Sequence, residues 1–374
     1  MRVVLTGGGT GGHVFPLLAV AEQLRTLAPD CRFHWFGSRR LEAAVVPQFG
    51  LAGTFVPFTF SYRRLSRNAL AYYFRVLPGW LAGYPVWAAI GLLRRFQPDI
   101  VISSGGYVSA PMLLAALTAG VPFALLEVNA VPGRVTVLFA PFAARLYCAT
   151  ASIAAAIARY AAPGAVKTVG FPSAPQETGK ATRESLGLPD GLPLVVVVGG
   201  STGSAAVNRL LAEAFADSGF AEKLGSRLAI LHQWGHEPSP RECAPFVRWP
   251  HYRAVAFHPG LAQLYRDATL YIGRAGAATI GELVNARLPA VLIPYPLHAD
   301  HQQYHNARAL VAAGAAVLLH EDEPAAAGRL RRLVEELALG DAGLAMRQRF
   351  AGFPGNGAEA IARDLAAGAC GGVA

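Results

Sequence analysis

The feature that most constrains this chain is a glycine-rich turn near its start. Residues 2–6 are typical of a buried strand, Gly7-Gly8-Gly9-Thr10-Gly11-Gly12-His13 follows at once, and residues 15–25 then predict a helix with Pro16 in its first turn. Such a turn gathers backbone N–H groups at the positive end of a helix dipole. The sequence therefore predicts an anion site suited to a phosphate or diphosphate.

His13 is the one ionisable side chain of this turn. Its pKa near neutrality suits either a general base or a hydrogen-bond donor to phosphate. The alternative is a histidine that only caps the following helix. The residues alone leave these three roles open.

The succession of strand, glycine turn and helix returns later in the chain. Residues 194–198 are typical of a buried strand, and Gly199-Gly200-Ser201-Thr202-Gly203-Ser204 leads from it into a predicted helix over residues 205–216. Similar turns follow predicted strands at residues 99–103 and 270–272. Because strands that alternate with helices form parallel sheets, we predict an α/β protein with two Rossmann-like domains.

Length and composition support two globular domains. A chain of 374 residues exceeds one ordinary core, and its 53% hydrophobic and 15% charged residues exclude a disordered chain. The Pro-containing stretch at residues 170–175 is the predicted boundary, which gives domains at 1–170 and 171–374. The four cysteines are scattered and no leader precedes the first strand, so we expect reduced thiols in a cytoplasmic protein.

The excess of positive charge lies entirely in the first half of the chain. Residues 1–170 hold 15 Lys and Arg against 5 Asp and Glu, a net charge of +10, whereas residues 171–374 have a net charge of −1. This asymmetry predicts that the N-terminal half faces an anionic surface, either phospholipid or nucleic acid.

Residues 61–95 interleave aromatic side chains with arginines, among them Arg63, Arg64 and Arg67. The uncharged run at 76–93 barely reaches spanning length, and its glycines and prolines disfavour a membrane helix. Aromatic rings at headgroup depth with arginines on phosphates are typical of interfacial segments, so we predict contact with an anionic membrane surface. An ordinary core helix is the alternative. No recognised nucleic-acid-binding module accompanies these residues, and we expect no nucleic-acid partner.

Gly7, Gly9 and Gly12 also fit the dinucleotide pattern G-x-G-x-x-G. No carboxylate follows the second strand to hold a ribose, so an NADP oxidoreductase would have to use Arg39 or Arg40. That hypothesis leaves the second half of the chain unexplained.

Further polar side chains gather where predicted strands and turns end. Glu127 and Asn129 close one strand, and Glu282 lies about one turn into a helix, where it can accept hydrogen bonds from the two hydroxyls of a ribose. Amides and imidazoles crowd residues 294–306, which indicates recognition of sugar hydroxyls. Metal ligation by the histidines and Asp300 of that stretch is the rival interpretation.

Together these motifs resemble the MurG family of glycosyltransferases. The likeness extends in order over nearly the whole chain and rests on residues 8–16, 105–109, 127–133, 199–201 and 302–306. The family transfers N-acetylglucosamine from UDP-N-acetylglucosamine to the lipid-linked muramoyl-pentapeptide of peptidoglycan synthesis. The resemblance implies the GT-B fold, two Rossmann-like domains whose parallel sheets face a central cleft. It also implies a peripheral position on the cytoplasmic face of the cell membrane.

The same resemblance implies roles for individual residues. The N-terminal domain is expected to bind acceptor and membrane, with His13 as the catalytic base and acceptor contacts at Thr10, Gly11, Gly12, Tyr107 and Glu127. The C-terminal domain, whose last helix can pack back on the first domain, is expected to bind the donor. The donor contacts are Asn129, Ser201, Gly203, Glu282, Gln302, Gln303 and Asn306. We expect no cofactor and no metal, since the chain contains no Asp-x-Asp.

Inverting glycosyl transfer is the expected reaction. A base deprotonates the acceptor hydroxyl, which attacks the anomeric carbon as UDP departs, and the turn at residues 199–204 stabilises the charge on the leaving diphosphate. The family's Asn-Pro-Val-Arg is Phe171-Pro172-Ser173-Ala174 here, so its arginine is missing. The alternatives are a related transferase with another acceptor, an enzyme like UDP-N-acetylglucosamine 2-epimerase, or a catalytically silent membrane scaffold.

Overall fold

The computed structural model describes residues 1–9, 11–57, 83–173, 183–200, 203–258, 260–297 and 301–370. The predictions for Thr10, for Ser201 and for most of the segment 61–95 lie outside these residues. The chain divides into two compact units, residues 1–175 with 354–374, and residues 176–353. The boundary predicted from the sequence, at residue 170, is slightly earlier, and the last segment of the chain belongs to the first unit.

Unit 1 is built on a parallel sheet that extends to both sides of its first strand. Among the described residues its seven strands lie in the order β3-β2-β1-β4-β5-β6-β7. They are β1 (Arg2–Thr6), β2 (Arg32–Ser38), β3 (Ala52–Val56), β4 (Ile100–Ser103), β5 (Phe123–Glu127), β6 (Arg145–Cys148) and β7 (Val166–Thr168). The order reverses beside β1, so β1 and β4 flank the switch point at which doubly wound sheets bind ligands. Thr6 of β1 pairs with Ser103 of β4, and the loops after both strands therefore start side by side.

Helices pack on this sheet, as parallel strands that are buried on both faces require. They are α1 (Gly11–Leu27), α2 (Leu41–Val45), α4 (Tyr84–Phe96), α5 (Ala110–Ala119), α6 (Arg134–Phe139) and α7 (Ala151–Ala158), with 3₁₀ turns η1 (Val46–Phe49), η3 (Tyr107–Ser109) and η4 (Ala140–Phe142). Val3, Val4 and Leu5 of β1 are fully buried. Within the described ranges, no helix is both long enough and apolar enough to cross a membrane.

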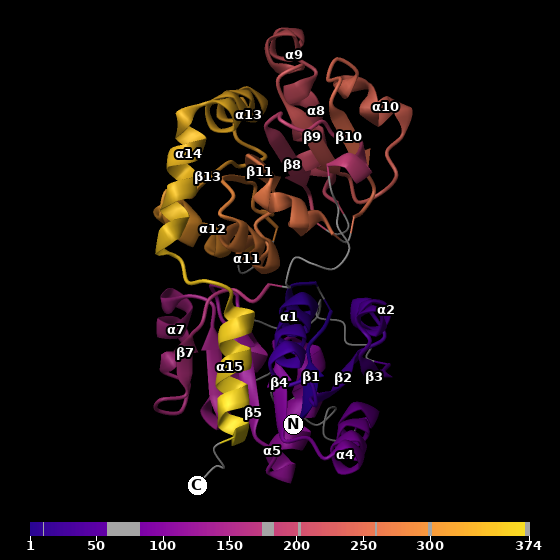
Figure 1. Ribbon diagram of the computed structural model, residues 1–374, viewed down its shortest axis with the longest axis vertical. Coiled ribbons are helices and arrows are strands. Elements are labelled where there is room, and N and C mark those ends of the chain that lie inside the picture. The colour runs from indigo at the N-terminus through magenta and orange to yellow at the C-terminus, as the bar shows by residue number, and fades with distance from the viewer. Residues whose placement is uncertain are drawn as a thin grey trace. The chain divides into compact units, whose positions relative to one another are not determined.

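The last helix, α15 (Gly357–Cys370), returns to unit 1 and packs against α1, the first helix of the chain (Figure 1). A polar contact fixes it there. The carboxylate of Asp364 accepts hydrogen bonds from the Tyr147 hydroxyl at 2.7 Å and from Lys167 Nζ at 2.5 Å. Helix α15 is thus tied to β6 and β7.

Unit 2 repeats the plan with a second parallel sheet. Among the described residues its six strands lie in the order β10-β9-β8-β11-β12-β13. They are β8 (Leu194–Val198), β9 (Ala229–Gln233), β10 (Tyr252–Val255), β11 (Leu270–Gly273), β12 (Ala290–Leu292) and β13 (Ala316–Leu318). Val198 of β8 pairs with Gly273 of β11. The switch point of this sheet therefore lies where the turns at 199–204 and 273–276 begin.

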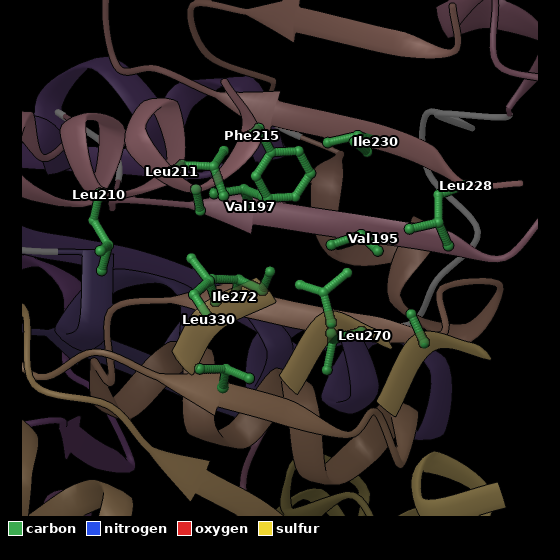
Figure 2. Packing of buried hydrophobic residues seen from close by; sticks show 14 of the residues in the cluster. Val195, Val197, Leu210, Leu211, Phe215, Leu228, Ile230, Leu270, Ile272 and Leu330 are labelled. Atoms are coloured by element: carbon green, nitrogen blue, oxygen red, sulfur yellow. The ribbon is translucent and has the colours of Figure 1, made fainter. Parts of the chain in front are cut away.

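The helices of unit 2 bury its sheet. They are α8 (Ala205–Phe215), α9 (Ser218–Leu224), α10 (Pro240–Cys243), α11 (Ala277–Ala286), α12 (Gln302–Ala312), α13 (Ala326–Val334) and α14 (Asp341–Gln348), with a π-helical turn η8 (Glu335–Leu339) and 3₁₀ turns η5 (Glu184–Leu186), η6 (Ala244–Phe246), η7 (Leu261–Arg266) and η9 (Arg349–Gly352). Figure 2 shows Phe215 and Leu211 of α8 and Leu330 of α13 among the valines, leucines and isoleucines of β8, β9 and β11. Each such side chain contributes about 1.5–3 kcal/mol when fully buried. The predicted fold class, an α/β protein with two Rossmann-like domains, is confirmed.

Candidate active site

Two glycine turns meet at the switch point of unit 1. The turn after β1 leads into α1, and the turn after β4 contains Gly105 and Gly106, both with positive φ (+84° and +77°). A Cβ at Gly106 would lie 3.2 Å from the carbonyl oxygen of Gly8. Glycine is therefore required here by both backbone conformation and close approach. The two turns therefore lie against each other.

His13 lies between these two turns, in the first turn of α1. Its Nδ1 is 2.9 Å from the carbonyl oxygen of Ser104, and the Ser104 hydroxyl donates in return to the carbonyl oxygen of His13 at 2.6 Å. Because a carbonyl oxygen can only accept, Nδ1 carries the proton, and Nε2 of the neutral ring keeps its lone pair. A Cβ at Gly106 would lie 3.5 Å from this Nε2. The nitrogen that can accept a proton therefore faces the second turn.

The surroundings of His13 shift its pKa in two directions. Burial lowers the pKa and outweighs the other effects, whereas the negative charges of Glu127 and Glu42 raise it. The net shift is downward, so the imidazole is neutral at pH 7. The two carboxylates then favour the imidazolium that forms once a proton is taken up. A neutral histidine with carboxylates nearby is suited to act as a general base.

Glu42 is a residue of this site that the sequence analysis missed. Its fully buried carboxylate accepts hydrogen bonds from Ser38 N at 2.8 Å, from the Ser38 hydroxyl at 2.5 Å and from Gly9 N at 3.2 Å. The N–H of Gly9 is thus directed at a carboxylate. It is not available to a phosphate, contrary to the expectation that the N–H groups of this turn are free. The sequence does not reveal that Glu42 belongs to this site, because its contact with Gly9 joins residues far apart in sequence.

Glu127 and Asn129 organise the loop after β5. The Glu127 carboxylate is buried and accepts from Asn129 N at 2.9 Å, Asn129 Nδ2 at 3.1 Å and Gly133 N at 2.9 Å. Both side chains thus hydrogen-bond within unit 1. The contacts with acceptor and donor predicted for them remain predictions.

The other predicted acceptor residues surround the first turn. Gly11 and Gly12 are the first two residues of α1, where backbone N–H groups have no partner within the helix. The ring of Tyr107 lies beside Gly9, since a Cβ at Gly9 would be 3.7 Å from its Cε1. The structure therefore brings His13, Gly11, Gly12 and Tyr107 together at one sheet edge.

The corresponding turn of unit 2 follows β8. Gly200 and Gly203 have positive φ (+111° and +73°), and Ser204 caps α8 by accepting a hydrogen bond from Val207 N. The buried Gln233 donates from Nε2 to the carbonyl oxygen of Gly200 at 3.1 Å, and its Oε1 accepts from His258 N at 3.0 Å. Gln233, also missed from the sequence, thus fixes the shape of a turn that opens a helix. Such a turn is suited to bind phosphate.

The remaining predicted donor residues lie on α11 and α12. Glu282 is half-buried, and burial raises its pKa to about 7. The side-chain oxygen of Gln303 accepts from Ala275 N at 3.3 Å and Tyr295 N at 3.0 Å, and Asn306 Nδ2 donates to the carbonyl oxygen of Ala275 at 3.4 Å. The side chains of Gln303 and Asn306 thus hold the loops around the turn. The sequence analysis assigned both amides to sugar recognition, and that role stays a prediction. Gln302 is half-buried at the start of α12.

The metal alternative gains no support from the described residues. Among them, no three His, Cys, Asp or Glu side chains are grouped as metal ligands. His298 and Asp300, which that interpretation needs, lie outside the described ranges.

Solved structures give the class of protein. MurG from Acinetobacter baumannii superposes with a TM-score of 0.72 at 24% identity, covering 98% of this chain and 99% of that chain. The glycosyltransferase SnogD from Streptomyces nogalater superposes with a TM-score of 0.69 at 19% identity, with coverage of 98% and 99%. The fold is thus that of the GT-B glycosyltransferases.

Sequence comparisons then give the family. Residues 3–148 match the glycosyltransferase family 28 N-terminal domain, and residues 194–362 match the family 28 C-terminal domain. The chain belongs to glycosyltransferase family 28.

Two curated relatives carry the same name, UDP-N-acetylglucosamine–N-acetylmuramyl-(pentapeptide) pyrophosphoryl-undecaprenol N-acetylglucosamine transferase. The one from Desulforudis audaxviator is 35% identical over 343 residues, 88% of each chain. The one from Chlorobaculum parvum is 33% identical over 377 residues, which cover 98% of this chain and 99% of the relative. The predicted resemblance is confirmed.

Proposed function

We propose that this glycosyltransferase moves N-acetylglucosamine from UDP-N-acetylglucosamine to a lipid-linked muramoyl-pentapeptide, with inversion at the anomeric carbon. The names of relatives that match nearly the whole chain support the two substrates. One observation supports the mechanism above the others. The neutral ring of His13 is held through Nδ1, and its Nε2 is turned to the meeting point of two glycine turns.

Nε2 of His13 takes the proton of the acceptor hydroxyl as that oxygen attacks the anomeric carbon. The nearby carboxylates of Glu42 and Glu127 stabilise the resulting imidazolium. Tyr107, Gly11 and Gly12 contact the acceptor, together with Thr10. General-base catalysis of this kind contributes roughly 10²–10⁴-fold in rate.

The turn at residues 199–204 binds the diphosphate of the donor. As the glycosidic bond breaks, charge develops on this diphosphate, and the N-terminus of α8 stabilises it with fixed N–H dipoles. The carboxylate of Glu282 accepts hydrogen bonds from the ribose hydroxyls. Gln302, Gln303 and Asn306 are the candidates for contacts with the sugar, and Gln303 and Asn306 also hold backbone groups of the adjacent loops.

A transfer assay tests this function. Purified protein is mixed with labelled UDP-N-acetylglucosamine and a panel of acceptors: the lipid-linked muramoyl-pentapeptide, the same lipid without the peptide, and an unrelated lipid diphosphate sugar. We expect label in the first acceptor, in a β linkage. Transfer only to another acceptor would establish a different substrate within the family. Release of an epimerised or unlinked sugar would contradict transfer.

We also propose that unit 1 binds the anionic cytoplasmic face of the cell membrane through the segment 61–95. The described part of this segment has features of both structures considered for it, an ordinary core helix and a segment that contacts the membrane surface. Val86, Ala89, Leu92 and Leu93 of α4 are buried, as in a core helix. On its other face Tyr84 and Trp87 are 65% and 63% exposed, and Arg94 and Arg95 are exposed in the last turn. Exposed aromatic side chains with arginines nearby are suited to a lipid interface.

Co-sedimentation with vesicles tests this membrane contact. The protein should sediment with anionic vesicles and be released by high salt, because screening weakens surface attraction. Replacing Arg63, Arg64 and Arg67 by Ser should reduce binding, whereas the matched change of the exposed Arg227, Arg248 and Arg253 of unit 2 should not. Equal binding by both triple variants would contradict the assignment.

A further inference from the structure

A buried arginine lies directly behind the glycine turn of unit 2. Arg274 follows β11 and is 6% exposed. Its Nη2 donates to the hydroxyl of Ser204 at 2.7 Å, and its Nη1 donates to the carbonyl oxygen of Ile293 at 3.0 Å. The guanidinium therefore joins the ends of three loops, those after β8, β11 and β12.

One carboxylate is paired with this guanidinium. Glu321, which follows β13, places Oε2 2.6 Å from Arg274 Nη1, and both side chains are nearly inaccessible to solvent, at 7% and 16% exposure. A buried arginine without a counter-charge would be strongly unfavourable. Glu321 provides that counter-charge on the Nη1 side, whereas Nη2 contacts the turn.

A positively charged side chain is unusual at the N-terminus of a helix, where Arg274 lies. Ser204 is the N-cap of α8, where the helix dipole is positive and where anions are normally stabilised. A guanidinium bound to this cap adds positive charge at the same point. The combined charge favours an anion in front of the turn and opposes a cation. A purely structural contact with Ser204 would not need a charged partner.

We propose that Arg274 is the positioning residue and fixed positive charge of the donor-diphosphate site, and that Glu321 sets how much of that charge the diphosphate experiences. Arg274 acts in two ways. It holds the Ser204 end of the turn in the geometry that presents the N-terminus of α8, and its field stabilises the diphosphate both when UDP-sugar is bound and when UDP leaves. This inference rests on the proposed use of a UDP-sugar donor.

Calorimetry of UDP and of uridine, with the full-length protein, separates charge from general structure. Arg274→Gln should weaken UDP binding by about tenfold or more, because a charge-assisted interaction is lost, while uridine affinity changes by less than about twofold. Arg274→Lys keeps the positive charge but lacks the planar set of N–H donors of a guanidinium, so it should have a UDP affinity between those of Arg274→Gln and wild type. Arg329→Gln is the matched control. Arg329 pairs with Glu323 at 2.7 Å and donates to the carbonyl oxygen of Leu318, so its loss should leave UDP affinity unchanged.

Glu321→Gln keeps the test decisive if Arg274→Gln does not fold. Removing the counter-charge should tighten UDP binding several-fold, with a steeper dependence on salt, and leave uridine unchanged. Equal weakening of UDP and uridine in Arg274→Gln, or unchanged UDP affinity in Glu321→Gln, would overturn the inference and leave the proposed donor intact. Wild-type protein that binds no UDP would overturn both.

Discussion

The two units carry the same strand, glycine turn and helix, but the charges behind the two turns have opposite sign. Behind the turn of unit 1 lies the buried carboxylate of Glu42, which binds Gly9 N. Behind the turn of unit 2 lies the guanidinium of Arg274, which binds Ser204. A carboxylate opposes a diphosphate and favours a protonated imidazole, whereas a guanidinium does the reverse. The same backbone motif is thus suited to proton transfer in one unit and to phosphate binding in the other.

Each unit also has a histidine near its turn, and the two histidines differ in how many of their ring nitrogens are hydrogen-bonded. His13 uses only Nδ1 among the described residues, and its Nε2 faces the second turn of unit 1. His232 of β9 is fully buried, with Nδ1 3.0 Å from the Tyr252 hydroxyl and Nε2 3.1 Å from Asn208 Oδ1. Because both nitrogens of His232 have partners, it is suited to hold β9 and α8 together. The hydrogen-bond count, and not the residue type, separates the candidate base from the structural histidine.

The largest expected effect is that of His13→Ala. We expect kcat to fall by about 10²–10⁴ while UDP affinity stays near the wild-type value, because the base acts on the acceptor. His34→Ala is a control within the same unit, since His34 is hydrogen-bonded to Thr54 and is in register with Val4 in the interior of β1. That variant should lose stability and retain kcat. A His13 variant that turns over normally and melts at a lower temperature would make His13 structural.

Replacing Glu42 tests the turn of unit 1. Glu42→Ala leaves the two buried donors of Ser38 and the half-buried N–H of Gly9 without an acceptor and should cost about 2–5 kcal/mol of stability. Glu42→Gln should fold better, but its amide opposes Gly9 N–H, so kcat should still fall. Denaturant unfolding and kcat report the two effects, with the exposed Glu359→Ala of α15 as the control. A Glu42→Gln enzyme with normal kcat would separate the carboxylate from catalysis.

His232 gives unit 2 a defined dependence on pH. Burial lowers its pKa to about 3 from 6.5. As the pH falls below 6.5, the unfolded chain takes up a proton that the folded chain resists, so stability is lost by about 1.4 kcal/mol per pH unit until pH nears 3. Hydrogen exchange of the β9 amides between pH 7 and 4.5 measures this slope. His232→Gln should abolish this slope. An unchanged slope in the variant would show that a group other than His232 causes the pH dependence.

The smallest expected effect concerns Glu282. Its pKa of about 7 means that the carboxylate ionises near neutrality. If it accepts hydrogen bonds from the ribose, UDP affinity should rise between pH 6 and 8, and Glu282→Gln should lower the affinity about tenfold at pH 8. UDP itself titrates near this range, so the comparison is between the pH profiles of wild type and variant. If the two pH profiles are parallel and the affinities are equal, Glu282 does not bind the ribose and only packs within unit 2.

Much of the fold could be predicted because its signals are local. Residues 194–198 have the predicted bounds, since a run of apolar and β-branched residues marks a buried strand. The strands β9, β10 and β13 were not identified, because they are short and because polar residues interrupt the apolar pattern in β9 and β10. The apolar pattern around residues 41–49 does not form one helix: α2 ends at Val45 and the chain continues as the 3₁₀ turn η1, which has Pro47 near its start.

The site was predictable in its backbone and not in its side-chain contacts. Glycine turns after strands identify the switch points of both sheets, so residues such as Gly106 and His13 could be found from spacing. The carboxylate of Glu42 and the guanidinium of Arg274 could not, because each is defined by partners that the sheet topology brings together. Gln303 and Asn306 show the converse: their polar side chains suggested sugar binding, which stays a prediction, whereas their bonds to backbone of the adjacent loops could not be foreseen.

The pH dependence of kcat/KM tests the central claim, that His13 is the base at the unit 1 turn, most directly. A base must be neutral, and burial lowers the pKa of His13 below 6.5. Wild-type kcat/KM should therefore fall on the acidic side with an apparent pKa below 6.5, and Glu42→Gln should move that pKa lower still, because a carboxylate that favours the imidazolium is lost. The residual activity of His13→Ala should lack this ionisation altogether. An acidic limb that persists unchanged in His13→Ala would contradict the claim.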